Sequence, residues 1–273
     1  MLTRRIPATG EALPAIGLGT WRTFDVGPSD AERAPRREVL RAFLAAGGRV
    51  VDTSPMYGRA EEVTGAVLEA LPAAPPPFLA TKVWTFGEEK GRAQIAESMR
   101  LLRTDRLDLL QIHNLVDWEV HLPTLRSLKR SGTIRYTGIT HWAPTAFPDL
   151  EAILRDEGVD FVQVPYSAAL RDAEARLLPA AADAGAAVLV MRPFEEGDLL
   201  RAAARRPLPG WAADLGARTW SEIFLKFILS HPAVTAVLPA TSSPAHLAEN
   251  VAAGAGPMPD AALRRRMGRE LRF

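Results

Sequence analysis

The sequence predicts an α/β fold, a (β/α)8 TIM barrel with a short N-terminal β-hairpin. Short apolar runs alternate with amphipathic segments of helical length, which is typical of parallel βα units. Eight such runs fit within the length of about 250 residues that this barrel usually takes. No low-complexity linker or change in composition divides the chain, so residues 1–273 are expected to form a single domain.

Each element is expected from a local pattern. The hairpin is expected at Leu2–Pro7 and Glu11–Pro14, with its turn at Thr9-Gly10. The barrel strands are expected at the apolar runs Ala15–Thr20, Arg49–Asp52, Phe78–Lys82, Leu107–His113, Tyr136–Thr140, Phe161–Pro165, Ala187–Met191 and Ala236–Pro239. The helices are expected at the amphipathic segments Arg36–Ala46, Glu61–Ala70, Gly91–Leu102, Thr124–Arg130, Ala146–Arg155, Ala173–Ala184 and Ser221–Leu229. The long segment Glu195–Gly216 is expected to pass over the top face of the barrel.

A doubly wound sheet is the competing layout for the same alternation. It would place a glycine fingerprint at the start of the first helix. The segment Gly17-Leu18-Gly19-Thr20-Trp21 lacks the third glycine at the required spacing. The barrel is therefore the favoured fold.

The composition narrows the classes of partner and site. The formal net charge is +1 and the isoelectric point is about 8.2, which favours neither nucleic acid nor a membrane surface as a partner. The chain has no cysteine, which excludes disulfides and thiolate ligands and fits a reducing compartment, so the cytoplasm is the expected location. Its five histidines are scattered without metal-ligand spacing, and no metal site is expected.

Four side chains of catalytic type follow successive strand candidates. Asp52 and Tyr57 lie where the second run opens into a loop, Lys82 ends the third run, and His113 ends the fourth. Each has an ordinary structural explanation on its own, such as a turn cap, rim packing or a hydrogen-bonded histidine. Barrel geometry brings all four to one mouth, because the carboxyl ends of the strands meet there.

These four groups together suit proton donation to a carbonyl oxygen. A phenol is a weak acid with an ordinary pKa of about 10, unless a nearby cation favours the phenolate. Lys82 can supply that cation, Asp52 can hold the ammonium in place, and His113 can form a hydrogen bond beside the reacting oxygen. Such a site would donate a proton to the oxygen while the carbon accepts a hydride, and in reverse it would oxidise an alcohol.

Seven segments of the chain occur in the order typical of one known family. They are Gly17-Leu18-Gly19-Thr20-Trp21, residues 52–58, Thr81-Lys82, Gln111-Ile112-His113, Gly138-Ile139-Thr140, Gln163 and residues 238–250. With these segments the chain resembles the aldo-keto reductase family over nearly its whole length. The resemblance implies a TIM barrel that reduces an aldehyde or ketone with NAD(P)H. It also implies that Asp52, Tyr57, Lys82 and His113 are catalytic, with Tyr57 as the general acid.

The resemblance also implies where the cofactor NADP(H) would lie. Its nicotinamide would sit deep in the mouth, with Thr140, His141 and Gln163 facing the carboxamide, and its adenosine end would lie near the last two strands. Gln163 interrupts an apolar strand, and a buried amide needs hydrogen-bond partners. The implied cofactor-binding positions are Gly19, Thr20, Asp52, Thr140, His141, Gln163, Met191, Arg192, Pro193, Phe194, Thr241, Ser242, Ser243, His246, Glu249 and Asn250.

Met191, Ala240 and His246 depart from the family pattern, and Thr140-His141 stands where the family usually has Ser-Asn. Met191 stands where many members place a tyrosine against the nicotinamide, and its thioether can pack on the ring or simply fill the barrel. Ala240 and His246 stand where NADPH-selective members commonly place Lys and Arg. Hydroxyl groups at positions 241–243 and the helix that starts at Pro244 remain to receive a phosphate. NADP(H) is therefore expected to bind, NAD(H) is possible, and discrimination between them is expected to be weak.

The expected partner is a small-molecule carbonyl substrate. Trp21, Trp84 and Trp142 each follow a strand end and are candidates for the pocket wall, although rim packing is an equal alternative. After Asn250 only a short tail with an Arg-rich helix from Asp260 follows. In many members of the resembled family a long C-terminal loop closes over the substrate, so a short tail here implies an open pocket. His121, His231 and Arg264-Arg265-Arg266 are expected at the surface.

Two other functions compete with carbonyl reduction. One is a redox sensor or regulatory subunit that binds the nicotinamide cofactor with little turnover. The other is a Schiff-base aldolase that uses Lys82 as its nucleophile. The intact set of four groups favours the reductase over both, and no motif predicts an oligomeric state.

Overall fold

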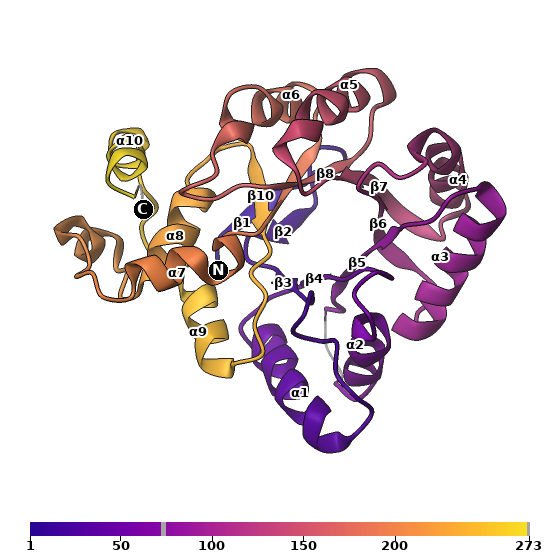
Figure 1. Cartoon of the computed structure of the whole chain (residues 1–273), viewed down its shortest axis with the longest axis horizontal. Coiled ribbons are helices and arrows are strands. Elements are labelled where there is room, and N and C mark those ends of the chain that lie inside the picture. The colour runs from indigo at the N-terminus through magenta and orange to yellow at the C-terminus, as the bar shows by residue number, and fades with distance from the viewer. Residues whose placement is uncertain (72–74, 272–273) are drawn as a thin grey trace.

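The computed structural model describes residues 1–71 and 75–271, and its centre is a barrel of eight parallel strands. The strands pair in chain order from β3 to β10, and the bridges Ile16–Val237 and Gly19–Ala240 close the wall between the first and last of them. Figure 1 shows the strands in the middle and the helices around them. The predicted (β/α)8 barrel with its N-terminal hairpin is therefore confirmed.

The bounds of the elements are as follows. The hairpin strands are β1 (Thr3–Arg5) and β2 (Ala12–Pro14), and the barrel strands are β3 (Leu18–Gly19), β4 (Val50–Asp52), β5 (Phe78–Val83), β6 (Leu107–His113), β7 (Ile134–Thr140), β8 (Phe161–Pro165), β9 (Ala187–Met191) and β10 (Val234–Val237). The α-helices are α1 (Asp30–Ala45), α2 (Ala60–Glu69), α3 (Glu88–Leu102), α4 (Trp118–Ser131), α5 (Phe147–Glu157), α6 (Leu177–Asp183), α7 (Asp198–Ala203), α8 (Trp220–Leu229), α9 (Pro244–Ala252) and α10 (Ala261–Glu270). Four short 3-10 helices are η1 (Pro144–Ala146), η2 (Asp172–Glu174), η3 (Glu195–Gly197) and η4 (Gly210–Leu215).

Three helices begin four or more residues away from their predicted starts. α1 starts at Asp30 rather than Arg36, because Ser29 and Glu32 form a reciprocal capping box at its N-terminus. α4 starts at Trp118 rather than Thr124 and contains a proline in its first turns. α6 starts at Leu177, since the expected first turn at Ala173 is the separate helix η2. The Ser-x-x-Glu spacing of Ser29 and Glu32 is a sequence pattern that predicts the observed start of α1.

The long segment after β9 is more ordered than the sequence indicated. It folds into η3, α7 and η4 instead of a simple excursion over the top face. Leu200 and Ala204, in and just after α7, line a cavity that also borders α8 and α9. This segment therefore builds one wall of a cavity beside the last strand.

Two apolar clusters lie on opposite sides of the barrel wall, because successive residues of a strand face opposite sides. The inner cluster fills the lower barrel, and the hairpin residues Ile6 and Leu13 belong to it. Its other members are Val50, Phe78, Ala80, Leu109, Tyr136, Phe161, Ala187, Leu189, Ala236 and Leu238. The hairpin thus closes the end of the barrel at which the strands begin, and the other end is left for polar groups.

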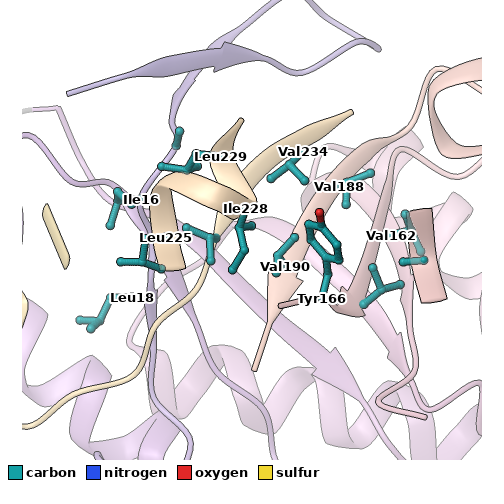
Figure 2. Packing of buried hydrophobic residues seen from close by; sticks show 14 of the residues in the cluster. Ile16, Leu18, Val162, Tyr166, Val188, Val190, Leu225, Ile228, Leu229 and Val234 are labelled. Atoms are coloured by element: carbon teal, nitrogen blue, oxygen red, sulfur yellow. The ribbon is translucent and has the colours of Figure 1, made fainter. Parts of the chain in front are cut away.

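The outer cluster joins the strands to the helices. Figure 2 shows Leu225, Ile228 and Leu229 of α8 beside outward-facing residues such as Val190 and Val234. All of these side chains are fully or almost fully buried. This packing holds the strand ends in place from outside.

Two expected surface residues are structural instead. His121 is fully buried, and its Nε2 lies 2.7 Å from the carbonyl oxygen of Thr85. Arg264 is mostly covered and braces α10 against the barrel: it donates to Ser230 Oγ at 2.7 Å and to Glu174 Oε1 at 2.6 Å. Both expectations failed because the C-terminal helix and the α3–α4 layer cover positions that a single sequence cannot place. His231 is half-buried, whereas Arg265 and Arg266 are exposed as expected.

Substituting Arg264 tests this brace. Arg264→Ala removes a donor to the buried Tyr166 hydroxyl, to Glu174 and to the end of α8, so we expect a loss of about 1–3 kcal/mol in the free energy of unfolding. Urea denaturation measures this change. The neighbouring exposed Arg265→Ala is the control, with an expected change within about 0.5 kcal/mol. Equal effects of the two substitutions would contradict the brace.

Candidate active site

The upper barrel interior is polar because every second residue of each strand points inward. Above the inner apolar cluster, the inward positions carry Asp52 on β4, Lys82 on β5, Gln111 and His113 on β6 and Gln163 on β8. Tyr57 follows from the loop after β4. The structure thus brings the four predicted catalytic side chains to one end of the barrel.

A buried ion pair forms the base of this group. Lys82 Nζ lies 3.0 Å from Asp52 Oδ1 and 2.8 Å from Asp52 Oδ2, and it also donates to the Thr53 carbonyl oxygen at 2.7 Å. Lys82 is 1% exposed and Asp52 is 3% exposed. Burial lowers the pKa of Lys82, but the charge of Asp52 and its hydrogen bonds to the ammonium outweigh that effect, so the pKa is raised and the ammonium persists.

Two glutamines complete the shell of Asp52. Gln111 Nε2 donates to Oδ1 at 3.3 Å, and Gln163 Nε2 donates to Oδ2 at 3.1 Å. The sequence singled out Gln163 because it interrupts an apolar strand, and Gln111 interrupts its own strand in the same way but was given no role. A methyl group at Gly138 would come within 2.9 Å of Gln111 Cγ, so the missing side chain at that position makes room for this amide.

Tyr57 lies over the ammonium. Lys82 Nζ is 5.1 Å from the centroid of the phenol ring. Burial raises the pKa of Tyr57 above its ordinary value, and the Lys82 ammonium opposes that shift without cancelling it. The sequence predicted only the effect of the Lys82 ammonium and not the effect of burial. The Tyr57 phenol is therefore more firmly protonated than expected.

His113 is held as a neutral imidazole. Its Nδ1 lies 2.9 Å from Ser54 Oγ, and its ring meets the ring of Tyr57 edge to face at 5.8 Å between centroids. Burial lowers the pKa of His113 to about 2, and the nearby Lys82 and His141 act in the same direction. Ser54 was not predicted as a site residue, although it lies two residues after Asp52, just past the end of β4.

A buried carboxyl lies behind this group. Glu61 on α2 is 2% exposed and accepts hydrogen bonds from Thr81 Oγ1 at 2.5 Å and Ser98 Oγ at 3.1 Å. Burial raises the pKa of Glu61, and the two hydroxyls lower it in part. The hydrogen bond to Thr81 ties α2 to the residue next to Lys82, a role that the sequence did not reveal.

Exposed aromatic side chains surround the mouth. Trp21, Trp84 and Trp142 are 36%, 41% and 53% exposed, and Phe86 is 71% exposed. The Arg22 guanidinium lies 4.0 Å from the centroid of Trp21, and the Arg192 guanidinium lies 5.9 Å from that of Trp142. The indoles are therefore available to a ligand at the mouth.

The residues predicted to meet the nicotinamide present free hydrogen-bonding atoms. Thr140 Oγ1 and Gln163 Oε1 are buried and have no partner among the described residues. His141 is partly exposed, accepts the Ala143 N–H at Nδ1 and stacks on Trp142. A buried polar atom without a partner is unfavourable, so these positions fit a ligand that carries an amide.

A second group of predicted cofactor residues lines a cavity of about 300 Å³. Phe194, Thr241, His246, Glu249 and Asn250 line it, together with Ala240 and residues of α7 and α8. Ser243 caps the N-terminus of α9 at this cavity, and its Oγ accepts the His246 N–H. In barrels of this kind, phosphate groups commonly bind at the loops after the last two strands and a short extra helix.

Other predicted cofactor positions lie outside both groups. Thr20 donates through Oγ1 to the Asp52 carbonyl oxygen, and Gly19 lets β3 approach β10, since a methyl group there would meet the Leu238 carbonyl oxygen at 3.1 Å. Met191 ends β9 and is partly exposed. Among the described residues that line the cavity next to α9, neither the exposed Ser242 nor the buried Pro193 occurs. Arg192 has a left-handed backbone conformation and lies 3.5 Å from Glu196.

A closed (β/α)8 barrel whose charged and titratable groups gather at the carboxyl ends of its strands is the architecture of a barrel enzyme. The sequence model of the Aldo/keto reductase family matches residues 15–265. The chain therefore belongs to the aldo/keto reductase family.

Similar proteins extend over most of the chain. A methylglyoxal reductase of Escherichia coli K12 is 28% identical over 260 residues, which cover 92% of this chain and 89% of that protein. An aldo/keto reductase from Klebsiella pneumoniae, solved in complex with NADP and acetate, has a TM-score of 0.81 and 26% identity over 96% of this chain and 93% of its own. A Klebsiella pneumoniae aldo-keto reductase in complex with NADPH has a TM-score of 0.82 at 26% identity, covering 99% of this chain and 96% of its own.

Residues 1–71 and 75–271 contain no group of three or more His, Asp and Glu side chains that could hold a metal ion. In the same residues no helix has the length and apolar character needed to cross a membrane.

The neutral state of His113 can be observed directly. Because its pKa is lowered to about 2, we expect no change in its ring chemical shifts between about pH 5 and pH 8, the range in which an ordinary imidazole titrates. NMR of the histidine rings measures this, with His113→Asn to assign the resonance. A midpoint for His113 within that range would contradict the proposed burial next to Lys82.

Proposed function

We propose that this protein reduces an aldehyde or ketone to an alcohol with NADPH. The observation that carries the proposal is the Asp52–Lys82 ion pair, buried directly beneath Tyr57 and beside the neutral His113. The family membership and the NADP(H) complexes of similar barrels support the same reaction.

Tyr57 serves as the general acid in this reaction. When bound, the nicotinamide supplies a hydride to the carbonyl carbon, and negative charge develops on the carbonyl oxygen. Tyr57 donates its proton to that oxygen, and the Lys82 ammonium stabilises the phenolate that results. Asp52 keeps the ammonium beneath the phenol, since both of its oxygens accept from Nζ.

His113 orients the carbonyl without competing for the proton. The Ser54 hydroxyl accepts the Met56 N–H, so its own proton is free to go to His113 Nδ1. That hydrogen bond leaves Nε2 as the protonated nitrogen, which then donates to the carbonyl oxygen. A neutral imidazole next to an ammonium adds a hydrogen bond and no repulsive charge.

Two hydrogen-bonding groups without partners deep in the mouth, the Gln163 amide oxygen and the Thr140 hydroxyl, fit the cofactor carboxamide. Gln163 Oε1 would accept its N–H, and the Thr140 hydroxyl would donate to its carbonyl oxygen. Gln163 Nε2 remains on Asp52, so this residue would link the cofactor to the ion pair. The cavity next to α9 would hold the adenosine end.

We propose NADP(H) as the cofactor and NAD(H) as a usable substitute. The cavity offers hydroxyl groups and the N–H groups at the start of α9 to a phosphate, but no Lys or Arg lines it among the described residues. Neutral donors bind a phosphate less strongly than a bidentate arginine does. The substrate is expected to be a small carbonyl compound that contacts Trp21, Trp84 and Trp142.

The competing functions gain no support from the geometry. A redox sensor with little turnover has no need for the assembled set of Asp52, Tyr57, Lys82 and His113. A lysine that forms a Schiff base normally reacts as a neutral amine, whereas the raised pKa of Lys82 keeps it an ammonium. The cytoplasmic location and a single domain over residues 1–273 remain predictions.

Removing the phenol hydroxyl tests the proposed acid. Tyr57→Phe is expected to lower kcat about 10²- to 10⁴-fold while cofactor affinity changes little, because the hydroxyl acts on the substrate oxygen. NADPH consumption with a panel of aldehydes and ketones measures the rate. Tyr136→Phe, at the opposite end of the barrel, is the matched control and should retain activity. An active Tyr57→Phe enzyme would contradict the assignment.

Adding a cation tests the proposed phosphate site. Ala240→Lys is expected to tighten NADPH binding about tenfold and to leave NADH binding unchanged, because only NADPH carries the 2′-phosphate. Quenching of tryptophan fluorescence during titration gives both affinities. In the unaltered protein the two should differ by less than about tenfold. A strong preference for NADPH before the substitution would show that other groups hold the phosphate.

A further inference from the structure

We propose that Phe86 is a specificity-determining residue, which makes the protein prefer carbonyl compounds with a long, uncharged apolar substituent over short or charged ones. The inference rests on the proposed function, because it assigns a substrate class to the mouth of the same site. Phe86 lies in the aromatic loop, residues 84–87, which joins β5 to α3.

The aromatic loop begins next to the reacting groups. It starts two residues after Lys82 at the carboxyl end of β5, and the ring of Trp84 lies 6.4 Å from the ring of His113 between centroids. Trp84 is 41% exposed and Phe86 is 71% exposed, so the loop leads from the site toward solvent. Two residues of chain span at most about 7 Å. A substituent that extends outward past Trp84 is therefore within reach of Phe86.

Hydrogen bonds from α3 fix the start of the aromatic loop. Gln94 accepts the Trp84 N–H at Oε1 over 2.6 Å and donates from Nε2 to the Trp84 carbonyl oxygen over 3.1 Å. One amide side chain thus satisfies both backbone polar groups of Trp84, as a neighbouring strand would do. The backbone at Trp84 therefore moves only when both bonds break.

The rest of the loop is held from the side of α4. Nε2 of the buried His121 donates to the Thr85 carbonyl oxygen over 2.7 Å. Asp117, directly before α4, accepts the Gly87 N–H at Oδ2 over 2.7 Å. His121 has room beside α3 because position 91 is a glycine, where a methyl group would come within 2.5 Å of the imidazole ring. Both helices thus form a rigid mount for the aromatic loop.

Phe86 itself is left uncovered on this rigid backbone. Its exposed fraction is the highest among the large apolar side chains that the structure describes. A ligand that covers the ring removes apolar surface from water, and the loop has little further conformational entropy to lose because it is already ordered. The arrangement therefore fits an apolar group of the substrate.

The charges at the rim of the mouth favour an uncharged substituent. Arg22 stacks on Trp21 and pairs with Glu196 at 2.9 Å. Arg192 lies near Trp142 and is 3.5 Å from the same glutamate. Because these two cations are already paired within the protein, a carboxylate on the substrate would gain little from them.

A series of aldehydes of increasing length tests this preference. Butanal, benzaldehyde and biphenyl-4-carbaldehyde form the neutral series, and 4-carboxybenzaldehyde is the charged probe. Steady-state rates of NADPH oxidation give kcat and KM for each compound. In the unaltered protein, KM should fall along the neutral series while kcat changes little, because the added rings bind equally in the ground and transition states. The charged probe should have a KM no lower than that of benzaldehyde.

Variants of the loop assign the preference to Phe86. Phe86→Ala should raise the KM of biphenyl-4-carbaldehyde about three- to thirtyfold and leave the KM of butanal unchanged, since only the long substituent reaches the ring. Phe86→Leu should keep most of the affinity. Val120→Ala, at an exposed apolar position of α4 outside the loop, is the matched control and should behave like the unaltered protein.

Gln94→Ala tests the rigid mount. Losing both bonds to Trp84 frees the loop, so the ratio of the biphenyl-4-carbaldehyde KM to the butanal KM should rise. Adding Phe86→Ala to this variant should then change the ratio less than Phe86→Ala does alone.

Three results would overturn the inference: equal KM values along the neutral series, a lower KM for the charged probe, or an equal effect of Phe86→Ala on butanal. Aldehydes would then still be reduced. A failure of the proposed function would instead appear as no NADPH oxidation with any of the four aldehydes, and it would remove the inference as well.

Discussion

The site depends on one buried ion pair, Asp52–Lys82, which the closed barrel forces into a fixed geometry. Its two charges lie directly above a fully apolar layer, so they can be satisfied only by each other and by neighbours at the same level of the barrel. The two glutamine amides and the Thr53 carbonyl provide those hydrogen bonds. Removing one partner of such a pair typically costs about 3–5 kcal/mol, because the other charge is left buried and alone. The fold therefore keeps both charges in place, where the proposed reaction would use them.

The same charges set the protonation of their neighbours. Burial alone would make Tyr57 too weak an acid, and the Lys82 ammonium opposes that effect, most strongly when a phenolate begins to form. Burial and the ammonium together keep His113 neutral. In the proposed reaction its imidazole is therefore a hydrogen-bond donor and not a competing acid, so a single buried cation separates the acid, Tyr57, from the orienting group, His113.

The strand pattern could be read from the sequence, and the contacts between layers could not. Alternation of inward and outward residues is a local property, which is why Asp52, Lys82 and His113 were placed correctly at strand ends. Gln111 carried the same signal as Gln163 and was overlooked. Ser54, Glu61 and Arg264 act through hydrogen bonds to residues far away in the chain, and no local pattern encodes such pairs. The early start of α1 was encoded locally in its capping box, but apolar periodicity does not register caps.

The central claim is that the buried pair beneath Tyr57 supports hydride reduction of a carbonyl group and not mere cofactor binding. A single-turnover experiment with NADPH carrying deuterium at both C4 positions tests this most directly, with a panel of small aldehydes and ketones as the carbonyl compounds and mass spectrometry of the product. The account predicts one alcohol per oxidised cofactor, with one deuterium on the new carbon–hydrogen bond. Tight cofactor binding without oxidation, or an alcohol without deuterium, would contradict it.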